Sequence, residues 1–102
     1  MGITVALQTE DGSRLAVVED PTNVLHRVLP DVEDSAFQWA GTIDWYGDTT
    51  FNSLQAQALR KEWDRLIRSA EGGTDAPFLR QVDELLRRAA EEVHLYVKFY
   101  GD

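Results

Sequence analysis

The sequence contains no cysteine, which excludes a disulfide framework, a thiolate metal site and a cysteine nucleophile. It also lacks the short motifs of common enzyme classes: a phosphate-binding glycine loop, a nucleophile elbow and a His-Glu-x-x-His pair. Its two histidines, His26 and His94, are far apart and do not have the spacing of a zinc site. We therefore expect no cofactor and no metal ion, and we favour a non-enzymatic role while leaving catalysis open.

A long apolar segment is missing as well. The first residues carry no cluster of cations, and their apolar run is interrupted by Thr4 and Gln8. A segment of this kind is neither a secretory signal peptide nor a membrane span. We expect a cytoplasmic protein without a membrane partner.

Positive charge is scarce. The chain carries 18 carboxylates against 10 lysines and arginines, a net charge of −8. Residues 1–52 contain nine of the carboxylates but only Arg14 and Arg27, giving −7, whereas residues 53–102 sum to −1. Because nucleic-acid binding depends on a basic surface, this distribution argues against direct binding of DNA or RNA. It favours a basic protein partner.

The 102 residues, 43% of them apolar, are enough for a single domain with one core. Apolar residues alternate over 3–8 and recur over 15–18, and the Asp11-Gly12 turn signal between them predicts a β-hairpin. A short helix should follow, capped by Thr22 or Asn23 and ended by Pro30.

Residues 37–45 are predicted to form a strand around which the rest is organised. A strand places alternate side chains on one face, so one face of this segment should be buried. The chain should then turn at Gly47, where glycine adopts a positive φ at low cost. Residues 49–51 either continue as a short strand or lead into a helix capped by Asn52 or Ser53. The apolar residues that share one parity are Phe37, Trp39, Ile43 and Trp45.

Two helices and a last strand complete the chain. Apolar stripes of helical period run through residues 52–70 and 75–92, with Gly72-Gly73 between them, and a strand-like alternation returns over 93–100. We predict an α+β fold, in which a small, mainly antiparallel sheet carries a two-helix hairpin on one face. The expected order is ββ, short helix, β, αα, β.

The sheet face that the helices leave uncovered is the first candidate binding surface. Tyrosine and histidine join apolar area to a polar tip, so this face could form a ligand groove or a self-association surface. The simpler interpretation is an ordinary exposed sheet face. Together with the adjoining turn, the candidate residues are Asp44, Tyr46, Asp48, Thr49, His94, Tyr96, Lys98 and Tyr100.

Asp44 and Asp48 are the sharper candidates within this set. Two carboxylates that converge can perform acid–base catalysis or bind a hard cation, and His26 and His94 are the only imidazoles that could join them. The simpler interpretation is that Asp48 bonds the backbone of the turn while Asp44 faces solvent or a basic neighbour.

An acidic loop at Asp31, Glu33 and Asp34 is the second candidate, either meeting a basic partner or only adding solubility. The helix charges have a local explanation as exposed ion pairs at helical spacing, worth about 0.3 kcal/mol each. The expected pairs are Arg60 or Lys61 with Asp64, and Glu84 with Arg87 or Arg88.

Three segments resemble a group of small bacterial proteins of unknown function: DPTNVLHRVLP from Asp20 to Pro30, IDWYGDTTFNSLQ from Ile43 to Gln55, and HLYVKFYGD from His94 to Asp102. The resemblance implies a compact bacterial domain and assigns no catalytic residue. The positions that it singles out are Asp44, Tyr46, Gly47, Asp48, Asn52, His94, Lys98 and Asp102.

Three functions are compatible with these features. The leading hypothesis is a small acidic protein-binding module, immunity or antitoxin-like, that occludes a basic protein partner. The first alternative is a small-molecule-binding domain or enzyme with a pocket near residues 44–50, His94 and Tyr96. The second alternative is a structural homodimer, joined through the sheet face or through a free strand edge over residues 93–100.

Overall fold

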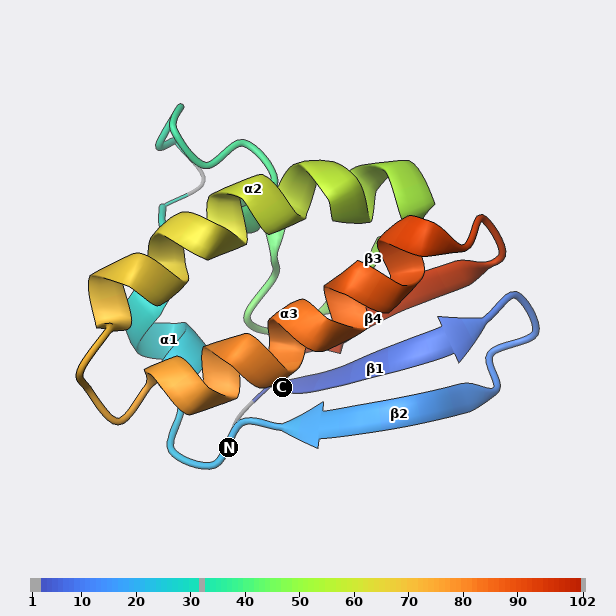
Figure 1. Cartoon of the computed structure of the whole chain (residues 1–102), viewed down its shortest axis with the longest axis horizontal. Coiled ribbons are helices and arrows are strands. Elements are labelled where there is room, and N and C mark those ends of the chain that lie inside the picture. Colours follow the sequence, from blue (N-terminus) through green and yellow to red (C-terminus); the bar gives the residue numbers. More distant parts are fainter. Residues whose placement is uncertain (1–2, 32, 102) are drawn as a thin grey trace.

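The computed structural model of the chain describes residues 3–31 and 33–101. It confirms the predicted α+β class and the order of the elements. Four antiparallel strands form one sheet in the order β2-β1-β4-β3 (Figure 1). Within the described residues, no helix has the length and apolar character needed to cross a membrane. The elements are β1 (Thr4–Thr9), β2 (Arg14–Glu19), α1 (Val24–Val28), the 3-10 helix η1 (Ala40–Thr42), β3 (Asp48–Phe51), α2 (Ser53–Ala70), α3 (Ala76–Glu91) and β4 (Leu95–Tyr100).

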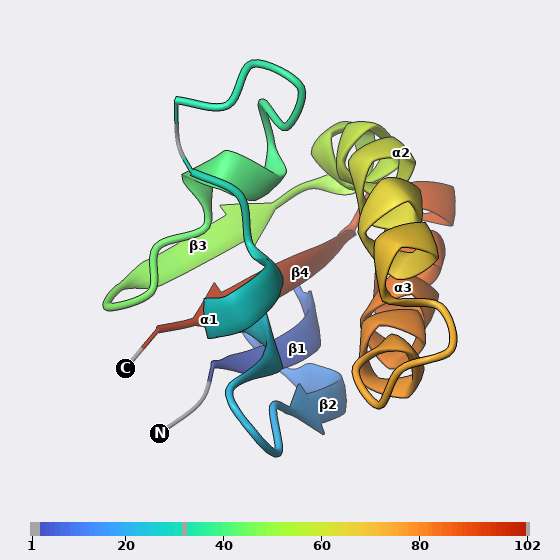
Figure 2. The ribbon, with the colours of Figure 1, turned by 90° about the vertical axis from the view of Figure 1, so that its left-hand side faces the viewer.

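Helices α2 and α3 lie side by side on one face of the sheet (Figure 2). Trp63 of α2 is fully buried, donates its indole N–H to the Leu79 carbonyl of α3 at 2.9 Å, and packs against Phe99 of β4. Arg60 donates two hydrogen bonds, of 2.9 and 3.1 Å, to Asp83 of α3. It therefore links the two helices instead of forming the predicted local pair with Asp64. The Glu84–Arg87 pair forms as predicted.

Strand β4 is an interior strand, paired with β1 on one side and β3 on the other. The prediction of a free edge over residues 93–100 is therefore wrong, and the edges are β2 and β3. Its alternation is confirmed, because Leu95, Val97 and Phe99 are buried beneath the helices while the residues between them are half-buried on the opposite face. An interior strand suits this sequence because it buries one complete apolar row.

The β1–β2 hairpin turns where the sequence predicts. Gly12 has a φ of +88°, and the Asp11 carboxylate accepts hydrogen bonds from the Thr9 hydroxyl and from the Ser13 N–H. These bonds, that of Thr9 foremost, lower the pKa of Asp11 to about 2. The strand register shifts beyond Leu7, so that Leu15 is the extra residue of a β-bulge.

Asp20, rather than Thr22 or Asn23, caps helix α1. One carboxylate oxygen accepts the Val24 N–H at 2.7 Å and the other accepts the Leu25 N–H at 2.8 Å. Asn23 occupies the N-cap position in a left-handed conformation, with a φ of 59°, but its side chain makes no capping hydrogen bond. A carboxylate three residues upstream can reach the helix only because the intervening chain bends.

Asp20→Ala is expected to lower the free energy of unfolding by about 1–2 kcal/mol, since it removes a charged cap and leaves backbone donors unpaired. Urea denaturation measures the change. Glu33→Ala, at an exposed acidic site, is the matched control and should stay within about 0.5 kcal/mol of wild type. Equal stability of both variants would contradict the capping role.

The strand predicted for residues 37–45 does not form. The backbone N–H groups of Trp39 and Ala40 donate to the buried carboxylate of Glu62 on α2, at distances between 2.8 and 3.1 Å. The chain then closes the short helix η1, in which the Thr42 hydroxyl donates to the Trp39 carbonyl at 2.6 Å. Local turns and one acidic side chain thus bind the backbone groups that a sheet ladder would have used. The third strand is instead β3.

Candidate functional site

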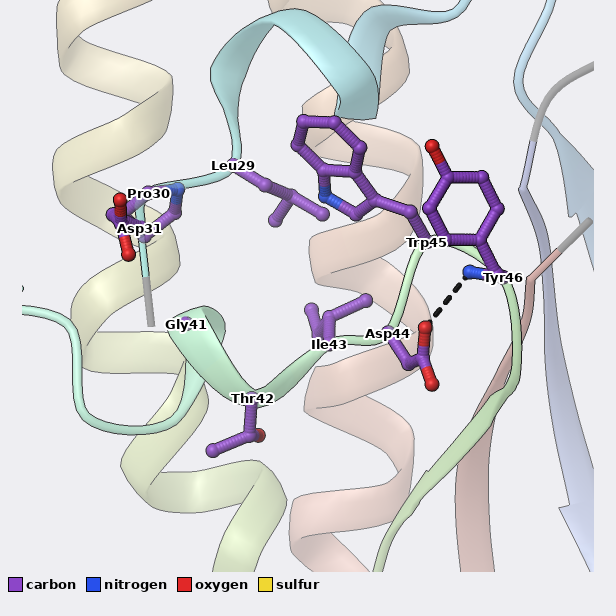
Figure 3. Close-up of a pocket in the computed structure, with 9 residues that line it drawn as sticks. All are labelled: Leu29, Pro30, Asp31, Gly41, Thr42, Ile43, Asp44, Trp45 and Tyr46. Carbon is purple, nitrogen blue, oxygen red and sulfur yellow. Dashed lines mark hydrogen bonds between the residues drawn. The ribbon is translucent and has the colours of Figure 1, made fainter. Parts of the chain in front are cut away.

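A solvent-open groove of about 630 Å³ lies between the end of α1 and the turn before β3 (Figure 3). Leu29, Ile43 and Trp45 point toward its middle, while Asp31 lies on one side and Asp44 on the other (Figure 3). The groove therefore combines an apolar floor with an acidic rim. Its lining residues are Leu29, Pro30, Asp31, Gly41, Thr42, Ile43, Asp44, Trp45 and Tyr46.

Each wall of the groove has a separate structural cause. Helix α1 ends at Val28, and Leu29 is extended with a ψ of 133°, because the residue before a proline disfavours the helical conformation. Helix η1, which contributes Gly41 and Thr42, is held against α2 by Glu62. Glu62 was not a candidate in the sequence, although it lies three residues after Leu59 and thus on the buried stripe of α2. An acidic residue on an apolar stripe is the signal that would have identified it.

The turn at Asp44 forms the third wall. Its carboxylate accepts the Tyr46 N–H at 2.8 Å, and its own N–H donates to the Thr49 hydroxyl at 3.0 Å. The predicted roles of the two aspartates are therefore exchanged, because Asp44 bonds the turn and Asp48 pairs with Lys98 at 3.6 Å. An Asx turn of this kind holds the aromatic residues after Asp44 in a fixed direction.

Gly47 is required by space and not by a positive φ. The glycines with positive φ in the described residues are Gly12 and Gly72. A Cβ added at Gly47 would lie 2.7 Å from the Asp44 carboxylate, and one added at Gly101 would lie 2.3 Å from the Gly47 carbonyl. The Gly101 N–H also donates to that carbonyl at 2.7 Å. The end of the chain is thus seated against the turn.

Exposed aromatic side chains mark the mouth of the groove. Trp45 is 36% exposed and Tyr46 is 78% exposed, although the alternation predicted a buried Trp45. The ring of His26, on α1, supports Trp45 edge-to-face at 5.0 Å. Its Nδ1 atom is buried and has no hydrogen-bond partner within residues 3–31 and 33–101. Trp45 is therefore held in place by packing, in a position from which it can contact another molecule.

The acidic loop adjoins this groove. Asp31 lines it, and one Asp31 oxygen accepts the Glu33 N–H at 3.1 Å, while an Asp34 oxygen accepts the Ala36 N–H at 3.0 Å. Both aspartates are exposed. The structure thus unites Asp31 from the acidic loop with Asp44 from the turn, which the sequence presented as separate candidates.

The other predicted site residues lie elsewhere. Thr49 lies on β3, where its hydroxyl accepts the Asp44 N–H, and Asp48 is paired in register with Tyr100. His94 is at the opposite end of β4, where its ring contacts the Glu10 carboxylate at 2.8 Å. His26 and His94 are therefore not brought together. In the described part of the chain, no three His, Asp or Glu side chains gather as a metal site requires.

The uncovered sheet face is largely occupied by its own side chains. The Tyr100 ring contacts two cations, the Arg14 guanidinium at 4.6 Å from the ring centre and the Lys98 ammonium at 4.7 Å. Its hydroxyl donates to the Gln8 side chain at 2.5 Å. A smaller hollow of about 280 Å³ remains beside Tyr96. Because its polar groups already bond one another, this face is a weaker candidate than the groove.

Two of the three segments that carry the resemblance to bacterial proteins line the groove, and the third is bonded to the turn beside it. His26 and Leu29 belong to the first, Trp45 belongs to the second, and Gly101 of the third is bonded to Gly47. These features define a class: an α+β domain with a helix pair on one sheet face and an acidic, aromatic groove. Comparisons with protein-family models, curated proteins and solved structures find no match to this chain. The resemblance thus stays a prediction.

Proposed function

We propose that this chain is a small acidic protein-binding module, similar in role to immunity and antitoxin proteins, whose groove receives a basic segment of a partner. The supporting observation is the meeting of Trp45 and Tyr46 with Asp31 and Asp44 around one apolar floor. Interfaces concentrate binding energy in aromatic anchors of this kind, whereas a carboxylate rim selects the partner's charge.

A lysine or arginine side chain fits the chemistry of the groove. Its aliphatic stem would lie on Leu29 and Ile43, and its charged head would reach the carboxylates of Asp31 and Asp44. The exposed face of Trp45 adds a cation–π contact. The −7 charge of residues 1–52 would speed the encounter with such a partner.

The test is quantitative capture of partners from source-cell extract by the tagged full chain at moderate salt, followed by affinity measurement with the purified partner. Trp45→Ala should weaken binding about 30-fold or more, as expected for an aromatic hot spot. Asp31→Asn and Asp44→Asn should each weaken it about 3- to 10-fold, because each amide oxygen keeps the turn bond while the charge is lost.

Two controls separate groove binding from general acidity. Tyr96→Ala changes the sheet face, and Glu92→Ala removes an exposed charge at the end of α3, so both should bind like wild type. A basic partner retained by these controls and lost by the groove variants supports the proposal. Recovery of no partner, or equal retention by every variant, refutes it.

A small-molecule ligand is the second candidate, favoured by the groove volume of about 630 Å³, a size typical of ligand sites. His94 and Tyr96, which this hypothesis included, do not line the groove, so Asp31, Asp44 and Trp45 would bind the ligand. Native mass spectrometry of the protein purified from its source tests this. A bound cationic compound that is lost in Trp45→Ala would favour it over a protein partner.

A further inference from the structure

The two edges of the sheet are unequal. Strand β3 is four residues long, and the chain beside it bonds to it through Thr49. Strand β2 is six residues long, and its inner four residues carry no charge. Leu15 and Val17 of β2 are 49% and 44% exposed. Sheet edges normally carry charges or prolines that prevent pairing, and the centre of β2 carries neither.

Within residues 3–31 and 33–101, no strand pairs with the outer side of β2. The Asp20 N–H donates to the Ile3 carbonyl at 3.2 Å, which sets the phase of the antiparallel ladder. Since residues of an antiparallel pair alternate between hydrogen-bonded and non-hydrogen-bonded positions, Val18 and Ala16 direct their backbone N–H and C=O groups toward β1. Val17 and Glu19 direct theirs outward. Val17 is the centre of this open row.

The bulge places the two charges of β2 on one face. Arg14 is in register with Gln8, and Glu19 is in register with Thr4. Gln8 and Thr4 are four residues apart on β1, so they share the face away from the helices. Arg14 and Glu19 are separated by an odd number and would face opposite sides in a regular strand. Leu15, the extra residue of the bulge, places Arg14 and Glu19 on the same face.

We propose that two copies of the chain pair through β2, antiparallel, about a two-fold axis at Val17. Val17 of each copy donates to and accepts from Val17 of the other, and the two sheets become continuous. Val17 is in register with Ala6 of β1, which lies midway between Gln8 and Thr4, the partners of Arg14 and Glu19. An axis at Val17 therefore places Arg14 of each copy opposite Glu19 of the other. A planar guanidinium can stack on Tyr100 and still donate to that carboxylate. The charges therefore specify this register.

Sedimentation equilibrium of the full chain over a range of concentrations tests the pairing. Wild type should show a mass that rises toward a dimer. Val17→Pro removes the outward N–H, which pairs with no strand in the described part of the chain, and should abolish the dimer while circular dichroism stays unchanged. Val17→Thr keeps the N–H and the shape, and should dimerise. A monomeric wild type at the highest concentration overturns the proposal.

Charge exchange tests the register independently. Glu19→Arg places like charges opposite one another and should raise the dimer dissociation constant about tenfold or more. Adding Arg14→Glu to the same chain restores opposite charges and should recover the dimer. A dimer that is insensitive to Glu19→Arg and to Val17→Pro would show that another surface joins the copies. These measurements need no basic partner, so the groove proposal and the pairing can fail separately.

Discussion

Glu62→Ala is expected to lower the free energy of unfolding by about 3 kcal/mol. The variant leaves the N–H groups of Trp39 and Ala40 without their acceptor, and Ala40 is fully buried. A buried donor without a partner costs about 1–3 kcal/mol, and bonds to a charged acceptor are stronger than neutral ones. Urea denaturation followed by circular dichroism measures the loss.

The matched control is Glu71→Ala. Glu71 is 65% exposed and pairs with Arg80 at 3.8 Å, so its removal should change stability by less than about 0.5 kcal/mol. Amide hydrogen exchange adds a local measure, because the N–H groups of Trp39 and Ala40 should exchange faster in Glu62→Ala alone. Unchanged exchange and stability in that variant would show that Glu62 does not hold η1.

Gly101→Ala is expected to lower the free energy of unfolding by about 2 kcal/mol. The added Cβ would lie 2.3 and 2.5 Å from the carbonyl and nitrogen of Gly47 and 2.8 Å from the Asp44 carbonyl. These are backbone atoms, so the end of β4 or the turn must shift, and the 2.7 Å bond between Gly101 and Gly47 is lost. Thermal and urea unfolding measure the effect.

Gly47→Ala is the comparison for Gly101→Ala, because it introduces a clash with a side chain and not with the backbone. Its Cβ would meet the Asp44 side chain at 2.7 Å, and a side chain can be removed. The cost of Gly47→Ala should therefore fall when Asp44→Ala is present, whereas the cost of Gly101→Ala should not. If Asp44→Ala relieved both, the backbone clash at Gly101 would not be the cause.

Glu62 and Gly101 do not line the groove, but each bonds a segment that leads into it. Glu62 fixes η1, which supplies Gly41 and Thr42, and Gly101 fixes the turn that carries Tyr46. A variant that loosens either should also weaken partner binding. The groove residues would then lose their preorganisation even though none of them has changed.

Elements whose signals are local were predicted well. The hairpin at Gly12, the cap at Asn52, which was one of two predicted caps, and the alternation of β4 follow from neighbours within a few residues. The helix pair follows from two apolar stripes joined by a short turn. Such features require only the chain's own periodicity and turn chemistry.

Residues 37–45 show where periodicity was insufficient. Their alternation is real, but a strand needs strand partners for its N–H groups. Here the N–H groups of Trp39 and Ala40 donate instead to Glu62, which is 22 residues away from Ala40 in the sequence. The sequence predicted a pocket near residues 44–50 but not its second wall at the end of α1, for a related reason. Leu29 and Trp45 come together only when α1 and the turn pack at one place, and no local spacing links them.

The sequence by itself determined the fold class, the order of the elements and the acidic character of the first half. Charge follows from composition alone, and the helix and strand patterns depend only on residues a few positions apart. Only the tertiary structure decided that β4 is interior, that Glu62 replaces a strand with η1, and that Asp31 and Asp44 border one aromatic groove. These outcomes arise from competition among distant groups for the same hydrogen bonds and the same buried space, which a linear pattern does not record.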